Sequence, residues 1–242
     1  MATILASLAP PLRAEAPRSR AQRWFLGCGI VGPVVFNATY LIAGAARSGY
    51  DPMRETISAM SLGPRGWIQV VNFILFGVLI AAFGIGGLRP ALRPGRGATV
   101  VPVLQVATGI CLIAAGVFVM DPATADGIAA PIITFHGEVH NAASYVALTA
   151  RVVGCLVLAV RFAREHAWRV WSVYSVITAL LMITFLGALG AAQAVDGPAG
   201  LFERLATLAG SVFTVALSAR LLTGSGHVGV HVREGAMLRH RA

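Results

Sequence analysis

The sequence predicts an all-α fold: a polytopic transmembrane helical bundle of six helices, with both ends in the cytoplasm (N-in/C-in). Of its 242 residues, 57% are hydrophobic and only 12% are charged, and the mean hydropathy is +0.75. Soluble globular domains carry about 25% charged residues. This chain therefore has too few polar side chains to cover a folded surface in water. Six apolar runs and an uneven distribution of arginine predict the number of helices and their orientation.

Each of the six apolar runs is close to the ~20 residues that an α-helix needs to cross the hydrocarbon core. Inside lipid the backbone must satisfy its own hydrogen bonds, which favours helices. The predicted spans are Trp24–Ala46, Trp67–Leu88, Thr99–Met120, Glu138–Phe162, Val170–Gln193 and Leu201–Leu222. They define a transmembrane domain over 23–222, and we expect flexible cytoplasmic tails at 1–22 and 223–242.

Arginine supplies all 19 basic residues, and it gathers on one side of the predicted spans. Fourteen arginines lie in or beside the two tails and the second and fourth connections. Four lie in or beside the other three connections, and Arg151 lies within a span. Because cytoplasmic connections carry the excess of positive charge, this distribution predicts the N-in/C-in orientation.

The same composition indicates location and partners. A chain without lysine and rich in Ala, Gly and Val is typical of a GC-rich bacterial genome, so we expect a multi-pass protein of a bacterial plasma membrane. The arginines lie between apolar runs and form no basic face on a soluble fold, which argues against nucleic acid as a partner. The lipid bilayer is the expected partner, together with a lipid-like small molecule.

The first outer connection mixes charged and apolar residues between positions 50 and 67. Asp51 and Pro52, with Glu55 following, are typical of a helix start that has an N-cap, a proline in the first turn and an acid further on. Gly63-Pro64 is expected to end this short helix. Trp67 occupies a position suited to an anchor at the membrane interface.

The second outer connection leads into the fourth span, which carries a polar stripe. His136 and His140 are four residues apart, so on a helix they share a face. The same face continues inward through Ser144, Ala147 and Arg151. Polar residues at membrane depth face protein or water rather than acyl chains. We therefore expect a polar pocket open to the outer side, formed by the first outer connection and the start of the fourth span.

One hypothesis for this pocket is a metal-dependent enzyme. Asp121, His136 and His140 are suitable ligand types for Zn²⁺, and a catalytic zinc site uses three protein ligands and a water molecule. Glu55 or Glu138 would act as general base, and Ser58 or Ser61 would stabilise an oxyanion or orient the substrate. Such a site at the outer lipid–water boundary would suit hydrolysis of a lipid ester or amide.

A structural interpretation of the same residues stays open. His136 and His140 would then cap a helix, or pair with Asp121, Asp51 or Glu55 in a buried polar network that joins the outer connections. Under either interpretation the glycine between the histidines allows close approach of a loop.

The second hypothesis is binding or transport of a lipid-like ligand without covalent chemistry. Arg151 lies about 22 Å below His136, at 1.5 Å per residue, and a buried arginine can hold a carboxylate or phosphate headgroup. Arg54 and Asn141 are expected to contribute at the outer mouth. The structural alternative for Arg151 is a side chain bound to carbonyl groups or neighbouring amides, or one that extends towards the cytoplasm.

Two segments resemble a known family. The first is Tyr50–Ser58, Tyr-Asp-Pro-x-Arg-Glu-Thr-Ile-Ser, with Gly66-Trp67 after it; the second is Gly116–Pro122, Gly-x-Phe-x-x-Asp-Pro, with His136-Gly137 and His140 after it. Together they resemble the signature of the domain of unknown function (DUF) 998 family, over roughly residues 25–222. The resemblance implies a six-helix membrane fold and no established activity.

Overall fold

The structure of the protein is a computed structural model that describes residues 19–92, 96–122 and 133–223. All regular secondary structure in these residues is helical. Within them, six helices are long and apolar enough to cross a membrane, and these are Arg20–Ala45, Gly66–Ala91, Ala98–Val117, Phe135–Ala163, His166–Ala194 and Ala199–Thr223. The predicted all-α bundle of six spans is therefore confirmed.

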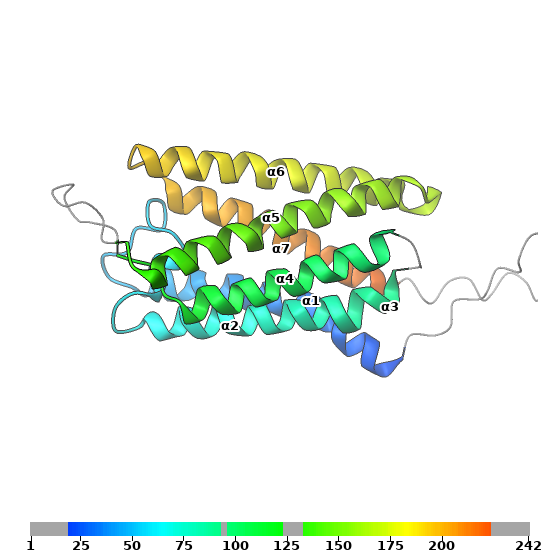
Figure 1. Cartoon of the computed structure of the whole chain (residues 1–242), viewed down its shortest axis with the longest axis horizontal. Coiled ribbons are helices and arrows are strands. Elements are labelled where there is room, and N and C mark those ends of the chain that lie inside the picture. The colour runs from blue at the N-terminus through cyan, green and yellow to red at the C-terminus, as the bar shows by residue number, and fades with distance from the viewer. Residues whose placement is uncertain (1–18, 93–95, 123–132, 224–242) are drawn as a thin grey trace, which may run out of the picture.

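The helices run along the long axis of the molecule (Figure 1). They are α1 (Arg20–Ala45), α2 (Gly66–Ala82), α3 (Arg89–Ala91), α4 (Arg96–Val117), α5 (Phe135–Ala163), α6 (Arg169–Ala194) and α7 (Ala199–Thr223). A π-helical segment, η3 (Phe83–Leu88), joins α2 to α3 within the second span, and two 3₁₀ turns, η2 (Ser58–Ser61) and η5 (His166–Trp168), lie in connections. Neighbours pack in the closed order α1, α2, α4, α5, α6, α7 and back to α1.

The ends of the predicted spans agree with the six membrane-spanning helices to within four residues. The main difference at the N-terminal boundary is that α1 begins at Arg20, so residues 20–22 are helical although the sequence analysis assigned them to the first tail. Ser19 caps this helix by accepting a hydrogen bond from the N–H of Gln22 (3.1 Å). The remainder of the two predicted tails, 1–18 and 224–242, lies outside the described residues.

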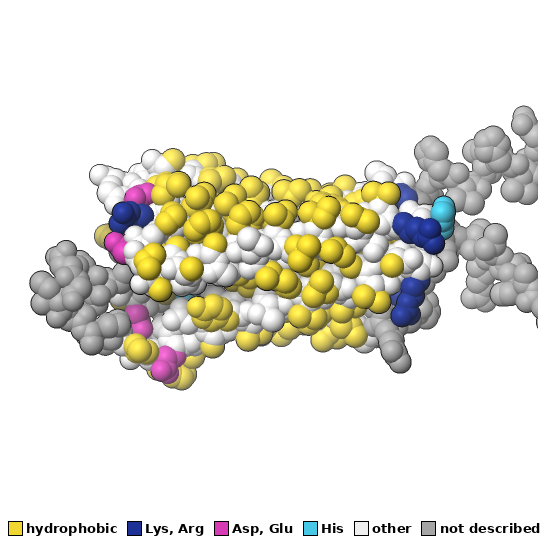
Figure 2. All heavy atoms as spheres, turned by 90° about the horizontal axis from the view of Figure 1, so that it is seen from above, with side chains coloured by type: hydrophobic (Ala, Val, Ile, Leu, Met, Phe, Trp, Pro, Cys, Tyr) yellow, Lys and Arg dark blue, Asp and Glu magenta, His cyan; other side chains and the backbone are white. Residues whose placement is uncertain are grey.

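The surface of the bundle separates into zones along its length. Figure 2 shows hydrophobic side chains covering the middle of the visible face, with charged side chains at the two ends. Large apolar side chains are exposed at mid-helix positions, and Val34 on α1 is 53% exposed while Ile110 on α4 is 60% exposed. Such side chains suit contact with acyl chains, as expected for an integral membrane protein.

Paired glycines let α2 and α4 approach closely. A Cβ atom added to Gly77 would lie 2.5 Å from the carbonyl oxygen of Gly109, and one added to Gly109 would overlap the carbonyl oxygen of Gly77. Inside a membrane the hydrophobic effect does not drive helices together, because lipid tails are as apolar as the side chains. Small residues at helix contacts are therefore a general means of close packing there.

A set of buried hydrogen bonds joins α1 to its two neighbours. The Nδ2 of Asn37 donates to the Oγ of Ser211 on α7 (3.0 Å), and the hydroxyl of Tyr40 donates to the Oδ1 of Asn37 (2.8 Å). On the other side, the Nδ2 of Asn72 on α2 donates to the carbonyl oxygen of Phe36 (3.1 Å). These bonds satisfy polar groups that lipid cannot solvate, and they fix α1 between α2 and α7.

The predicted short helix starting at Asp51 and Pro52 is wrong in extent. The capping bonds form, since the Oδ1 of Asp51 accepts from the N–H of Met53 (2.9 Å) and the Oε1 of Glu55 accepts from the N–H of Asp51 (2.8 Å). The chain makes one turn there and then leaves the helical path, and the only helical element before α2 in this described connection is η2. The reason is that the N–H of Ile57 bonds to α7 and not to the preceding turn.

Candidate functional site

The connection between α1 and α2 is fastened to the start of α7. The backbone N–H groups of Gly200 and Leu201 donate to the carbonyl oxygens of Arg54 (3.0 Å) and Met53 (2.9 Å). The first N–H groups of a helix have no partner within it, so the connection satisfies two of them. A Cβ atom at position 200 would overlap the carbonyl oxygen of Glu55, which explains why glycine stands there.

Arg204 on α7 completes this attachment. Its Nη1 donates to the carbonyl oxygens of Glu55 (2.9 Å) and Gly200 (2.8 Å), and its Nη2 donates to the hydroxyl of Tyr50. That hydroxyl in turn donates to the carbonyl oxygen of Thr56 (2.9 Å). Burial raises the pKa of Tyr50, so the phenol stays protonated and able to donate.

A small pocket of about 40 Å³, partly open at its surface, lies between the helices beneath this connection, and we call it the internal cavity. A water molecule needs roughly 10–15 Å³ measured in this way, so the cavity has room for two or three. Its walls come from the connection and from α1, α2, α4, α5 and α7, and they comprise Phe36, Ile57, Ser58, Phe73, Phe76, Leu112, Ser144, Ala147, Leu148, Arg151, Glu203 and Thr207.

Glu203 and Arg151 are the two charged residues of the cavity wall. The Oε2 of Glu203 accepts a hydrogen bond from the backbone N–H of Ile57 (2.5 Å) and so holds the roof of the cavity on α7. Arg151 lies deeper, since a Cβ atom at Gly210 would be 2.7 Å from its Nη2. Gly210 follows Glu203 by seven residues, or about 10 Å along the helix. The guanidinium of Arg151 is therefore about 10 Å below the level of Glu203 on α7.

The guanidinium of Arg151 is incompletely bonded. Its Nη2 is inaccessible to solvent and has no hydrogen-bond partner among the described residues. The residue as a whole is partly buried, and it lines the internal cavity. The guanidinium carbon lies 5.8 Å from the ring centre of Phe76, a cation–π contact that compensates a buried charge only in part.

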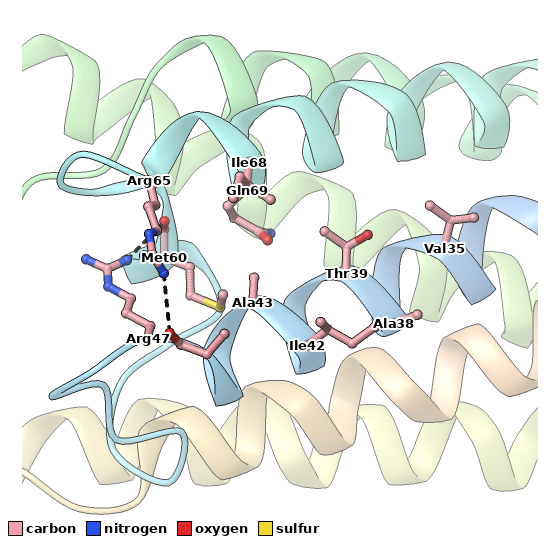
Figure 3. A pocket seen from close by; sticks show the side chains of 11 residues that line it. Val35, Ala38, Thr39, Ile42, Ala43, Arg47, Met60, Arg65, Ile68 and Gln69 are labelled. Carbon is pink, nitrogen blue, oxygen red and sulfur yellow. Dashed lines mark hydrogen bonds between the residues drawn. The ribbon is translucent and has the colours of Figure 1, made fainter.

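A larger groove of about 480 Å³ lies between the halves of α1 and α2 that are nearest the connection joining them (Figure 3). We call it the α1–α2 groove, and its lining comprises Val35, Ala38, Thr39, Ile42, Ala43, Ala46, Arg47, Met60, Arg65, Ile68 and Gln69. Most of its wall is apolar, and the two arginines lie at the end nearest the connection. Its volume falls within the roughly 300–1,000 Å³ of ordinary ligand sites.

The two arginines of the groove differ in how firmly they are held. Arg47 donates from Nη1 to the carbonyl oxygen of Met60 (3.2 Å) and from Nη2 to that of Leu62 (2.9 Å), so it is part of the folded connection. Arg65 is exposed, and its Nη1 makes a long contact of 3.4 Å with the carbonyl oxygen of Ala46 (Figure 3). Arg65 is therefore the more available of the two cations.

A buried amide lies deeper in the same groove. Gln69 is 1% exposed, and its Oε1 accepts from the Nδ2 of Asn72 (3.3 Å). Its Nε2, by contrast, has no hydrogen-bond partner in the part of the chain that the structure describes. The side chain of Gln69 points from α2 into the space between the helices, towards Thr39 on α1 (Figure 3). An unpaired buried donor costs about 1–3 kcal/mol, so this position favours a ligand with an acceptor oxygen.

Asp121 and His136, two of the predicted zinc ligands, lie at the start of α5. The Oδ1 of Asp121 accepts from the hydroxyl of Thr134 (2.6 Å) and its Oδ2 accepts from the N–H of Thr134 (2.9 Å). These bonds, with a smaller contribution from His136, lower the pKa of Asp121. The His136 ring packs against Phe118 at 5.3 Å between centres. A Cβ at Gly137 would overlap the Asp121 carboxylate, so this glycine does permit a close approach.

His140 has different partners. It is 2% exposed, and its Nδ1 lies 2.8 Å from the carbonyl oxygen of Ala115 and 2.9 Å from that of Phe118. Because both neighbours are acceptors, Nδ1 must carry the proton. The ring thus satisfies carbonyl groups at the C-terminal end of α4, which have no partner within the helix. Across residues 19–92, 96–122 and 133–223, no three His, Cys, Asp or Glu side chains group as metal ligands would.

The remaining predicted site residues are spread over the end of the bundle that carries the connection between α1 and α2. Ser58 lines the internal cavity with Arg151, whereas the carboxylate of Glu55 bonds to the N–H of Asp51. Arg54 is exposed and pairs with Asp196 (3.0 Å). Asn141 is exposed on α5. Their catalytic and ligand-binding roles stay predictions.

The site residues predicted from the sequence did not include Arg47, Arg65, Gln69, Glu203 or Arg204, although Gln69 and Glu203 were candidates to line a polar seam within the bundle. A signal was available for three of them. Glu203 and Arg204 are adjacent charges at the start of a span, and Gln69 is an amide at membrane depth, where polar side chains are costly. The positions of Arg47 and Arg65 on one groove depend on how the connection folds, which no local pattern specifies.

Comparison with known proteins agrees with this architecture. No curated protein and no solved structure matches the chain. A family model does match, over residues 30–220, and its description is protein of unknown function (DUF998). The match covers all six membrane-spanning helices except the first turns of α1 and the end of α7. The chain is therefore a member of the DUF998 family of integral membrane proteins.

Proposed function

We propose that this protein binds an anionic glycerophospholipid in the α1–α2 groove, with the phosphate at Arg65 and Arg47 and an acyl chain along α1. The observation that carries the proposal is the order of groups along the groove. Two cations lie at its outer end, the unpaired amide of Gln69 follows one helical turn below Arg65, and apolar side chains continue inward to Val35.

This order matches the layout of a glycerophospholipid. Arginine binds phosphate oxygens through charge-assisted hydrogen bonds, and basic pockets between membrane helices bind anionic headgroups. The amide of Gln69 is suited to an ester carbonyl, which carries an acceptor and no donor. From Arg47 to Val35 is twelve residues along α1, or about 18 Å, which is comparable with an extended acyl chain.

The orientation of the bundle supports the same proposal. We infer from the arginine distribution that the connection between α1 and α2 faces outward across a bacterial plasma membrane. The proposed headgroup site then lies at the outer interface. Trp67, which is 65% exposed beside Arg65, is the type of residue that anchors a helix at this depth.

The metal-dependent hydrolase considered for Asp121, His136 and His140 stays a prediction. Nothing in the described residues favours it over lipid binding, because His140 holds carbonyl groups of α4 and both oxygens of Asp121 bond to Thr134. Zinc content of the purified protein is the measurement that bears on it.

Native mass spectrometry of the delipidated protein tests the lipid proposal. Palmitoyl-oleoyl phosphatidylglycerol and the matched phosphatidylcholine are added separately. We expect tighter binding of phosphatidylglycerol and an affinity loss of about tenfold in Arg65→Gln, as for one charge-assisted hydrogen bond. Arg54→Gln serves as control because Arg54 is an outer arginine that lies away from the groove.

A second pair of variants tests the groove itself. Ala38→Trp fills it, whereas Leu41→Trp adds the same side chain to an exposed position on α1 outside the lining. We expect Ala38→Trp to abolish phosphatidylglycerol binding and Leu41→Trp to leave it unchanged. Equal affinity for the two lipids, or full binding by Ala38→Trp, would refute the proposal.

A further inference from the structure

The internal cavity contains a buried charge without a partner, and it is separate from the α1–α2 groove. The Nη2 of Arg151 is inaccessible and has no hydrogen-bond partner in the described part of the chain. Within residues 19–92, 96–122 and 133–223, no carboxylate forms a salt bridge with this arginine. A buried charge without compensation is strongly destabilising, so a bundle that keeps one at this depth needs an anion or water there.

The neighbouring cavity wall suits an anion. Arg151 forms its deep end, and the hydroxyl-bearing residues Ser144 and Thr207 also line it. Hydroxyl groups donate hydrogen bonds to an anion as readily as they accept them from a cation. The wall carboxylate, Glu203, lies about 10 Å from the level of the guanidinium along α7 and accepts the N–H of Ile57. The deep end is therefore positive, and the negative charge is held at the roof.

The size of the cavity restricts the ligand. A volume of about 40 Å³ is enough for a halide ion or the carboxylate of a short acid and is small for a lipid headgroup. We infer that Arg151 is the anchor of a binding site for a small monovalent anion, such as chloride or a short carboxylate. The ligand would reach it from the outer end, past Ile57 and Ser58.

Thermal unfolding of the full chain in detergent tests this inference. Sodium gluconate, whose anion is too large for the cavity, is replaced stepwise by sodium chloride or sodium acetate at constant ionic strength. A ligand at about ten times its Kd raises the unfolding temperature of a protein of this size by roughly 3–6 °C. We expect a saturable rise of this order for the wild type. A rise with acetate alone identifies a carboxylate site, and a rise with chloride identifies a halide site.

Arg151→Met removes the charge and keeps most of the side-chain volume. We expect this variant to lose the anion-dependent rise. It should also unfold in gluconate at or above the wild-type temperature, because it no longer buries an unpaired cation. Arg169→Met, the same substitution at an exposed position on α6, should keep the rise. A purely structural role for Arg151 predicts the opposite for Arg151→Met, a lower unfolding temperature in every salt.

A second variant covers the case in which Arg151→Met does not fold. Gly210→Ala introduces a Cβ atom 2.7 Å from the Nη2 of Arg151 and displaces the guanidinium, whereas Gly154→Ala on α5 meets no atom within 4 Å. We expect Gly210→Ala to weaken the anion-dependent rise and Gly154→Ala to preserve it. No anion dependence in the wild type, or an undiminished rise in both Arg151→Met and Gly210→Ala, would overturn the inference.

Discussion

The Oε2 of Glu203, on α7, accepts a hydrogen bond from the backbone N–H of Ile57 at 2.5 Å. The two residues are 146 positions apart in the chain, and this bond holds the connection over the internal cavity. It also explains why the turn that begins at Asp51 does not continue as a helix, since the N–H of Ile57 is directed to α7.

Replacing Glu203 should loosen this roof. Glu203→Ala leaves the N–H of Ile57 without its acceptor, at a cost of about 1–3 kcal/mol, or roughly 3–8 °C in unfolding temperature. Glu203→Gln keeps an acceptor oxygen, so its loss should be smaller. Thermal unfolding in detergent measures both, with Glu138→Ala, an exposed carboxylate on α5, as control. Equal losses in the alanine and glutamine variants would show that the charge, and not the hydrogen bond, matters.

The contact between α2 and α4 depends on the absence of side chains at Gly77 and Gly109. Gly77→Ala forces the helices apart, because the new Cβ would lie 2.5 Å from the carbonyl oxygen of Gly109. Overpacking of this kind costs about 1–3 kcal/mol. Gly190→Ala on α6 meets no atom within 4 Å and should be neutral or stabilising, since alanine favours helices over glycine. Similar unfolding temperatures for the two variants would contradict the close packing.

The sequence predicted the spans because their signal is local. An apolar run of bilayer length must become a helix, and the ends were predicted to within four residues. The polar stripe on the fourth span was also a local pattern, and the structure sets Ser144, Ala147 and Arg151 along the internal cavity. The partners of these residues were beyond local reasoning.

His140 and Arg47 illustrate that limit. His140 belongs to the same stripe, but its ring bonds to the carbonyl groups of Ala115 and Phe118, and a sequence does not specify which helix end lies opposite a given side chain. Arg47 reaches carbonyl oxygens of Met60 and Leu62 because an irregular connection folds back onto α1. Backbone acceptors of this kind are present at every residue, so side-chain identity gives no signal for them.

The two histidines should differ sharply when replaced. His140→Ala leaves the buried carbonyl group of Ala115 and the partly buried one of Phe118 without their donor, and we expect a loss of about 1–3 kcal/mol. His136→Ala changes an exposed residue and should stay within about 0.5 kcal/mol of the wild type. Chemical or thermal unfolding gives the comparison. Zinc analysis accompanies it, and a stoichiometric zinc ion that is lost in the His136→Ala/His140→Ala double variant would establish the metal site instead.

Acid should weaken the connection between α4 and α5 through Asp121. Hydrogen bonds from Thr134 lower the pKa of this carboxyl from its ordinary value of 3.8, so its ionised form is favoured in the folded state. The resulting stability is present above the ordinary pKa and is lost as the pH falls through the lowered value. We expect the difference in unfolding temperature between wild type and Asp121→Asn to be constant from pH 7 to about 5 and to vanish near pH 2. Glu138→Gln, at an exposed position, should show no such loss of difference.

The orientation inferred from arginine can be tested at the two ends of the bundle. In a background with Cys28→Ala, Cys111→Ala and Cys155→Ala, single cysteines are introduced by Arg54→Cys in the connection before α2 and by Arg164→Cys after α5; both positions are exposed. Because the arginine-rich side is retained in the cytoplasm, a membrane-impermeant maleimide should label position 54 in intact cells. Position 164 should be labelled only after the membrane is opened. The reverse pattern would place the α1–α2 groove and the roof of the internal cavity on the cytoplasmic side, and the proposed lipid and anion would then have to come from the cell interior.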